Sequence, residues 1–173
     1  MLDAPFDPDS RVEAVEAPSG TDLGSLVGLA REVYVEVALD DDFDYRLAEI
    51  AAHGFRAKAR CSGGPAQLRW FLLECRSQRL RYKLTGGLHH ARRTGDEYGF
   101  LNVLAAVVFS DEDALDDDDP QAIELSASGF RWRDEVAAPD EVAYARNARL
   151  HSIGSCSFFE PVSELEALGV LPL

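Results

Sequence analysis

The chain has 173 residues, of which 46% are hydrophobic, and a formal net charge of −14 at pH 7. This composition excludes global disorder and fits one domain with a core, whereas the acidic excess argues against nucleic acid or an anionic membrane as a partner. The longest apolar run, residues 101–109, is too short to cross a bilayer, and the amino terminus lacks a secretory signal pattern. We therefore expect a cytoplasmic protein, with residues 1–10 as a flexible tail and residues 11–173 as a single domain.

Short strand-like runs alternate with segments of helical periodicity along the chain. The predicted strands begin near Val12, Val33, Phe55, Arg81, Phe130 and His151. The predicted helices cover residues 20–31, 43–53, a segment opened by Pro65, and residues 98–110, 120–127, 140–150 and 162–168. The acidic run 111–119 predicts a solvated loop, because it lacks the spacing and the glycine of an EF-hand calcium site.

Strands that alternate with helices over short links predict βαβ units and a parallel sheet. Alternate strand residues are charged, so one sheet face should be apolar and the other should carry Glu36, Arg56, Lys58, Arg60, Lys83, Thr85, Arg131 and Arg133. A doubly wound sheet buries both faces under helices and would not tolerate these charges, whereas a (β/α) barrel has an inner face that is polar near its carboxyl rim.

A closed barrel of eight units needs about 250 residues. The sequence therefore predicts an α/β fold with an incomplete or open (β/α) barrel of about six parallel strands, in which a homodimer is one way to cover the open sheet edges. The alternative is an α+β domain whose sheet shows its polar face to water.

Positive charge is concentrated in residues 54–93, which hold ten basic residues and one acidic residue, Glu74. This concentration favours a small anion, such as phosphate or carboxylate, bound nearby, unless the basic residues pair with acidic residues of other segments. The chain has only two lysines, Lys58 and Lys83. Because a desolvated lysine amine can lose its proton and arginine does not, these two positions are candidates for chemistry.

Lys58 and Lys83 are expected on adjacent strands, with Glu36 on the strand before, and these three residues are the candidate catalytic residues. A lysine beside another cation should have a lowered pKa, which suits a Schiff-base nucleophile. Alternatively, both lysines stay charged and clamp a phosphate or carboxylate together with Arg60. Glu36 would accept a proton or act as the counter-ion of the lysines.

Small residues follow three of the polar strands, in residues 60–64, 85–90 and 154–158. Glycine pairs permit positive φ and let backbone N–H groups approach an anion, so these loops predict an anion cradle. The candidate substrate-binding residues here are Arg60, Gly63, Gly64, Thr85, Gly86, Gly87, His89, His90, Ser155 and Ser157.

One of His89 and His90 is a candidate acid or base, and neighbouring side chains on an extended segment point to opposite sides, so we do not expect both at one ligand. A metal ion would need a third ligand such as Glu36 or Glu16, which the spacing does not require, and the sequence predicts no metal and no cofactor. The three cysteines lack C-x-x-C spacing and are expected as buried thiols, with a nucleophilic Cys156 as the alternative.

Four segments, AKAR at 57–60, KLTGGLHH at 83–90, YGFLN at 98–102 and GSCSFFEP at 154–161, carry a resemblance over most of the chain from about Glu13. They resemble a bacterial (β/α) barrel-like family of unknown function. Members of that family are longer at the amino terminus, so the resemblance implies that this chain corresponds to the later part of a barrel. This resemblance implies no activity. We add Asn102, which lies in the third segment, to the candidate substrate-binding residues.

The chain also shows a weaker similarity to quinolinate phosphoribosyltransferase, an open barrel with the motif Arg-Lys-Thr-Thr-Pro-Gly-Leu-Arg. The matching residues are Lys83, Thr85, Gly87 and Leu88, whereas Leu84 and Gly86 depart from the motif. The separate amino-terminal domain of that enzyme has no counterpart here. The similarity implies that Lys83 contacts an anionic substrate.

Together these features predict an enzyme that binds a small anionic metabolite at the carboxyl rim of the barrel and performs lyase or group-transfer chemistry with Lys58 and Lys83. The competing interpretation is a non-catalytic scaffold or interaction domain whose charged sheet face is an internal salt-bridge network.

Overall fold

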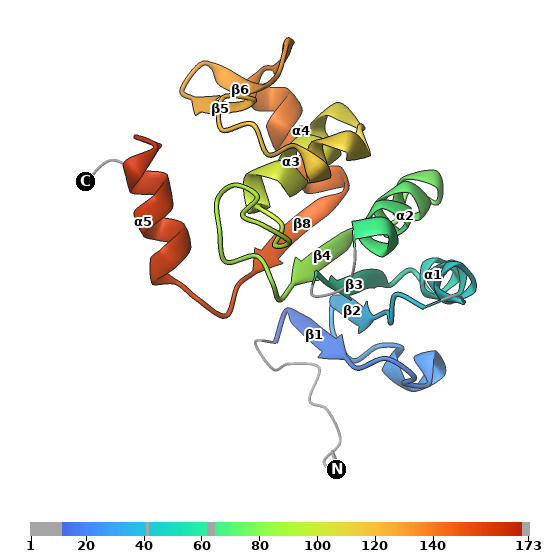
Figure 1. The fold of residues 1–173 in the computed structure, drawn as a ribbon. Helices are drawn as coiled ribbons and strands as arrows, with labels where there is room; N and C mark the ends of the chain where they lie inside the picture. The colour runs from blue at the N-terminus through green and yellow to red at the C-terminus, as the bar shows by residue number, and fades with distance from the viewer. Residues whose placement is uncertain (1–11, 41, 62–64, 171–173) are drawn as a thin grey trace.

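The computed structural model describes residues 12–40, 42–61 and 65–170, so the predicted tail lies outside the described residues (Figure 1). Its main layer is a sheet of five parallel strands in the order β1-β2-β3-β4-β8. These strands are β1 (Ala14–Ala17), β2 (Glu32–Glu36), β3 (Arg56–Arg60), β4 (Tyr82–Thr85) and β8 (Leu150–Gly154). The parallel sheet confirms the α/β class.

Helices occupy the connections between the strands. They are η1 (Leu23–Leu26), α1 (Phe43–Ala52), α2 (Pro65–Ser77), α3 (Phe100–Phe109), η2 (Glu112–Asp116) and α4 (Pro139–Ala148), with α5 (Phe159–Ala167) after β8. In Figure 1, α1 and α2 lie together beside β2 to β4, whereas α5 lies well apart from them. Across the described part of the chain, no helix combines the length and the apolar character needed to span a membrane.

Alternation along the strands puts small and apolar side chains on one face of the sheet, where they are buried together with the apolar stripes of the helices. Fully burying one aliphatic or aromatic side chain contributes about 1.5–3 kcal/mol, so this shared core is what attaches the helices to the sheet. The core includes Val33, Val35, Ala57, Ala59 and Leu84 of the strands, Leu47 and Ile50 of α1, Leu68 and Phe71 of α2, and Val103 and Ala106 of α3.

Strand order follows chain order throughout the main sheet. Right-handed crossovers in such a sheet place the connecting helices on one face, which leaves the alternate face free to carry charge. Among the described strands, β1 and β8 are edges and do not pair with each other. The sheet is therefore open and has five strands, one fewer than predicted.

The expected sixth parallel strand, near Phe130, belongs instead to a separate antiparallel sheet of β5 (Ile123–Ser126), β6 (Gly129–Trp132) and β7 (Glu135–Ala137). The helix predicted over residues 120–127 is wrong for the same reason, because Ile123 and Leu125 pair across the ladder with Trp132 and Phe130. Arg131 and Arg133 therefore do not lie on the main sheet, where the sequence predicted them. Arg131 instead pairs with Glu124 at 2.8 Å, and Arg133 pairs with Asp117 at 2.8 Å.

Most other predicted helices are found within a few residues of their expected ends, as α1, α2, α3, α4 and α5. The segment 20–31 is the exception, because only Leu23–Leu26 forms a 3-10 turn. Gly28 adopts a φ of +80°, which an α-helix cannot accommodate, so the turn does not extend to Arg31.

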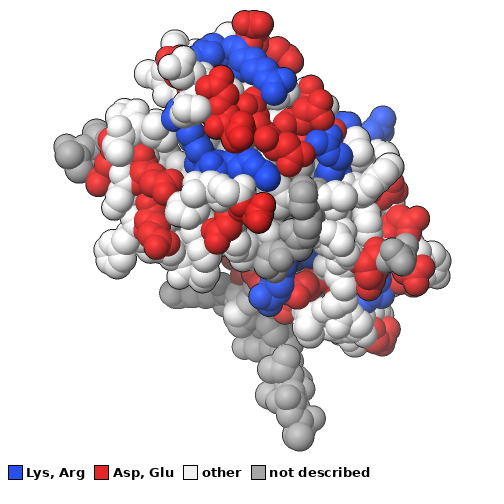
Figure 2. Space-filling model, viewed as in Figure 1, with Lys and Arg blue, Asp and Glu red and all other residues white. Residues whose placement is uncertain are grey.

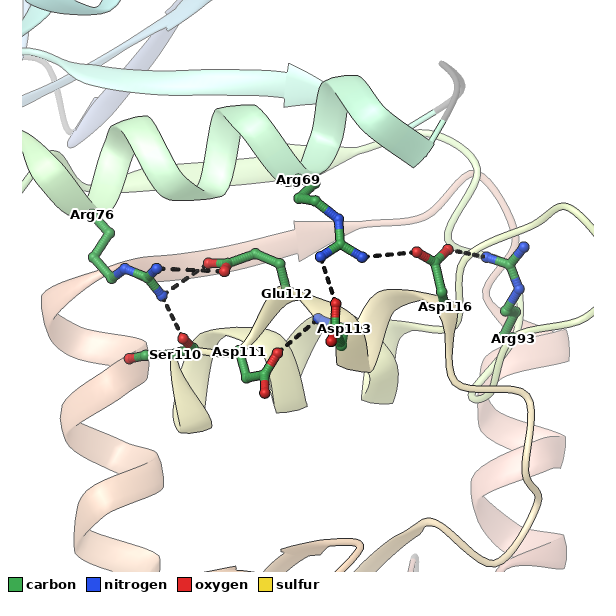
Figure 3. A network of polar contacts seen from close by, with 8 residues as sticks. All are labelled: Arg69, Arg76, Arg93, Ser110, Asp111, Glu112, Asp113 and Asp116. Atoms are coloured by element: carbon green, nitrogen blue, oxygen red, sulfur yellow. Dashed lines mark hydrogen bonds and ion pairs between the residues drawn. The ribbon is translucent and has the colours of Figure 1, made fainter.

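The acidic run after α3 is not a solvated loop over its whole length, although the sequence predicts one. Residues 112–116 form η2, which packs along α2 and pairs with its arginines (Figure 3), whereas Asp118 and Asp119 are exposed loop residues. The Arg69 guanidinium lies 2.7 Å from Asp113 and 3.0 Å from Asp116, and the Arg76 guanidinium lies 2.9 Å from the Glu112 carboxylate. Because the Glu112 side chain is only 9% exposed, this segment is an anchored part of the fold.

Basic and acidic side chains are intermixed on the face of the molecule drawn in Figure 2. The ion pairs explain this arrangement, since arginines of the basic segment reach acidic residues of other segments, as in Arg56 with Glu32 at 2.6 Å and Arg93 with Asp116 at 3.3 Å. The positive charge that these arginines contribute to residues 54–93 is therefore neutralised by acidic residues of the same protein.

Candidate functional site

The charged residues on the second face of the main sheet form a cluster of Glu16, Glu36, Lys58 and Lys83, hereafter the lysine–glutamate cluster. Lys58 on β3 and Lys83 on β4 are register partners, and Glu36 on β2 is the register partner of Lys58 on its other side. Because side chains at paired positions of parallel strands project from the same face, the two lysines and Glu36 are neighbours, as expected from the sequence.

Glu16 joins the two lysines. Its Oε2 lies 2.8 Å from Lys58 Nζ, and its Oε1 contacts Lys83 Nζ. Glu36 lies 3.0 Å from Lys58 Nζ through Oε2 and 2.9 Å from Arg60 Nε through Oε1. The Lys58 and Lys83 side chains are only 12% and 18% exposed, so these contacts form in partly desolvated surroundings.

Burial by itself would lower the pKa of Lys58, but its bonds to Glu16 and Glu36 outweigh burial and raise the pKa above the ordinary value. The bonds from Lys58 and Lys83 lower the pKa of Glu16, and those from Arg60 and Lys58 lower the pKa of Glu36. The prediction that a neighbouring cation lowers the lysine pKa is therefore wrong for Lys58, since two carboxylates stand beside it. Lys58 is held as an ammonium ion.

Two members of this region were not among the predicted site residues. Glu16 is the bridging carboxylate, and Tyr34 lies with its ring centroid 5.4 Å from Lys83 Nζ while its hydroxyl accepts a hydrogen bond from Arg56 at 2.8 Å. The alternation of Glu16 with Val15 and Ala17 in a strand was the signal that placed Glu16 on this face.

The loop after β4 has the backbone expected of a glycine pair, since Gly86 and Gly87 have φ of +70° and +71°. The Gly86 N–H donates to the Gly154 carbonyl at 3.2 Å, so this amide holds β4 to β8 and is not available to an anion. The Thr85 hydroxyl donates to the Ala59 carbonyl at 3.4 Å. Gly63 and Gly64 lie outside the described residues.

His89 and His90 turn to different partners beyond the end of β4. His89 Nε2 lies 2.7 Å from Cys156 Sγ, and His90 Nδ1 lies 2.7 Å from Glu164 Oε1, a bond that raises the pKa of His90. Both rings still approach the same oxygen of Glu97, at 4.0 Å from His89 Nδ1 and 3.8 Å from His90 Nε2. The hydrogen-bond partners of the two rings are thus different, and the expectation that both do not meet at one ligand stays a prediction.

The three cysteines are free thiols with contrasting surroundings. Cys61 and Cys75 are buried, as predicted, and burial raises the pKa of Cys61 to about 12 and that of Cys75 well above its ordinary value. Cys156 is exposed, so the expectation of a buried thiol is wrong at this position. Its place in the loop after β8, rather than in the apolar alternation of the strand, is the reason.

A cavity of about 500 Å³ lies between α3, β8 and α5. Ser155 and Ser157, predicted as substrate-binding residues, line it, and the Ser157 N–H donates to the Ser155 hydroxyl at 3.2 Å. Most of the other lining side chains are apolar, and they include Leu88, Phe100, Leu104, Leu125, Ile153, Phe158, Val162 and Leu165.

Asn102, another predicted substrate contact, is 1% exposed in α3. Its Oδ1 accepts from the Arg93 N–H at 2.8 Å, and its Nδ2 donates to the carbonyls of Ala114 at 2.9 Å and Asp117 at 2.8 Å. The two bonds to Ala114 and Asp117 tie the acidic segment to α3, and the bond from Arg93 ties the loop before α3 to the same side chain. They explain the buried amide without a ligand.

Within the described ranges, no group of three or more His, Cys, Asp or Glu side chains is placed to hold a metal ion. Comparison of the chain with protein-family models and with curated proteins gives no match. Fold and site together define an α/β protein with an open parallel sheet, a desolvated charge cluster on one sheet face and a thiol–imidazole pair beyond the ends of β4 and β8.

Proposed function

We propose that the chain is an enzyme that binds a small carboxylated or phosphorylated metabolite on the charged face of the main sheet, with Lys58 and Lys83 holding the anion. The observation that carries this proposal is the position of Glu16, whose two carboxylate oxygens each contact one lysine. A carboxylate or phosphate of a ligand offers the same pair of oxygens at the same spacing, so it can take the place of Glu16.

The charges and positions of the cluster support an exchange of this kind. Glu16 stands on β1, an edge strand, and its side chain is 43% exposed, so it can leave the lysines without breaking the core. Lys58, Lys83 and Arg60 outnumber Glu16 and Glu36 by one positive charge. Because the lysines are partly desolvated, their attraction for an anion is stronger than it would be in bulk water.

The chemistry that fits charged lysines is group transfer on the bound substrate, in which the ammonium groups stabilise negative charge that develops on the transferred group. The raised pKa of Lys58 disfavours a Schiff base at that residue, which needs the neutral amine. We include in the proposal that the open sheet is part of a (β/α) barrel, whose active sites lie at the carboxyl ends of the strands.

A second candidate function is a non-catalytic scaffold in which the cluster is only an internal salt-bridge network. The observation in its favour is that both lysines already have carboxylate partners. Such a network predicts that removing Glu16 destabilises the fold and brings no affinity for anions.

Thermal shifts and calorimetry with inorganic phosphate, glycerol 3-phosphate and citrate distinguish the two functions, because a ligand that binds only the folded state stabilises it by an amount that rises with the ratio of ligand concentration to Kd. We expect wild type to bind at least one of these anions, Lys83→Met to bind it about tenfold more weakly or worse, and Glu16→Gln to bind it more tightly, since the internal competitor is gone. Arg81→Met removes an exposed positive charge just before β4 and is the matched control, expected to bind like wild type.

Binding of no anion by either wild type or Glu16→Gln contradicts the proposed function. If Glu16→Gln in addition melts at a lower temperature than wild type, the scaffold is the better description.

A further inference from the structure

Cys156 and His89 form a thiol–imidazole pair that joins segments 67 residues apart in the chain. His89 lies in the loop after β4 and Cys156 in the loop after β8, and these two strands are paired in the sheet. The pairing of Thr85 with Gly154 at the strand ends brings the two loops together. The Sγ to Nε2 distance of 2.7 Å puts the imidazole within reach of the thiol proton.

This pair has the parts of an activated nucleophile. A nucleophilic thiol needs a base that removes its proton and a position that the substrate can reach. A third group that orients the base makes this proton removal more efficient. Cys156 is exposed, unlike Cys61 and Cys75, and His89 Nδ1 faces a Glu97 carboxylate oxygen at 4.0 Å. The Cys156 thiol, the His89 imidazole and the Glu97 carboxylate are therefore arranged one after another in space.

Residues next to Cys156 and His89 in the chain line the apolar cavity. Ser155 and Ser157 on either side of Cys156, and Leu88 next to His89, all line that cavity, whose volume of about 500 Å³ is within the range of small-molecule sites. The cavity continues between α3 and α5 past Leu104 and Val162. A ligand whose reactive carbon meets the thiol can therefore extend an apolar chain into it.

We propose that Cys156 is a catalytic nucleophile with His89 as its base, acting on an ester or thioester that carries an apolar acyl chain. Sγ forms a bond to the carbonyl carbon while His89 Nε2 takes the thiol proton. The tetrahedral intermediate then expels the alcohol or thiol, which takes that proton from His89, and the acyl group remains on Cys156 as a thioester. For hydrolysis, His89 takes a proton from water, the hydroxyl adds to the carbonyl, and Sγ leaves and recovers the proton.

The inference does not depend on anion binding by the lysine–glutamate cluster, because none of its steps uses Lys58 or Lys83. The two proposals stand or fall in separate experiments.

The first test is the rate of alkylation by iodoacetamide, with the modified residue located by peptide mass spectrometry. We expect rapid modification of Cys156 in the folded protein, with the buried thiols of Cys61 and Cys75 protected. Removal of the base in His89→Asn should slow the reaction at Cys156 about tenfold or more. His53→Asn removes an exposed imidazole at the end of α1, whose Nδ1 contacts the Glu49 carbonyl, and should leave the rate within about twofold of wild type. An unchanged rate in His89→Asn overturns the role of His89.

The second test uses p-nitrophenyl octanoate and p-nitrophenyl acetate as probes. We expect release of p-nitrophenolate with an acyl adduct on Cys156, no adduct at this position in Cys156→Ala, and a faster reaction with the octanoate than with the acetate. Val162→Trp partly fills the cavity and should reduce the octanoate rate to near the acetate rate while leaving the acetate rate unchanged. An adduct on another residue, or equal rates for the two esters in wild type, overturns the proposal, and melting curves of all variants verify that they are folded.

Discussion

Replacing Asn102 with alanine tests whether this residue supports the fold or the ligand site. The side chain is 1% exposed and makes three hydrogen bonds, all within the protein. Alanine removes the amide group and leaves the Arg93 N–H and the carbonyls of Ala114 and Asp117 without these partners. We therefore expect a large loss of stability.

The size of the loss follows from the groups left behind. A buried polar group that loses its partner costs about 1–3 kcal/mol, and a carbonyl, with two lone pairs, costs less than an amide N–H. One amide and two carbonyls, together with the space vacated in α3, give an expected loss of about 3–5 kcal/mol in the free energy of unfolding.

Urea unfolding followed by circular dichroism measures this change by linear extrapolation. Asn147→Ala is the matched control, because Asn147 is exposed on α4, and it should stay within about 0.5 kcal/mol of wild type. A loss below about 1 kcal/mol for Asn102→Ala would refute the structural role of the side chain and return Asn102 to the ligand site.

Three further predictions concern pH, a helix end and a nearly buried ion pair. The bond from Glu164 raises the pKa of His90, so it stabilises the fold below the ordinary histidine pKa and this contribution disappears as pH rises through the raised value. An NMR titration should show the His90 pKa fall in Glu164→Gln, and the difference in melting temperature from wild type should shrink above neutral pH. Arg79 follows α2 with a φ of +54°, so Arg79→Gly should gain about 0.5–1 kcal/mol and raise the melting temperature by about 2 °C, whereas Arg79→Ala should gain nothing. Arg76→Met leaves the Glu112 carboxylate nearly buried without its 2.9 Å partner and should cost about 2–3 kcal/mol in urea unfolding, while the double variant with Glu112→Leu should recover part of this loss.

Several elements could be predicted from local sequence because their signals are local. The helix opened by Pro65 shows an apolar stripe at helical spacing, and the apolar stretch that became α3 is longer than a typical strand. The neighbourhood of Lys58 and Lys83 was also predictable, because strands of alternating character that follow one another across short helices pair in chain order.

Other elements were mispredicted because their outcome depends on residues far away in the chain. Residues 120–127 begin like a helix, with Asp119 before Pro120, but Ile123 and Leu125 gain more by pairing with β6. The acidic run looked solvated, yet α2 supplies Arg69 and Arg76 to neutralise it. Neither partner can be recognised within a local window of sequence.

The amino-acid sequence by itself determined the α/β class, most of the helices and which strand face carries the lysines, since these depend on the period of polar and apolar residues along the chain. Only the tertiary structure decided that Glu16 bridges the lysines and that His89 meets Cys156. The contact of Glu16 with Lys83 and that of His89 with Cys156 each join residues 67 positions apart. Side chains at such a separation come into contact only when the strands beside them pair in the sheet, and that pairing depends on residues throughout the chain.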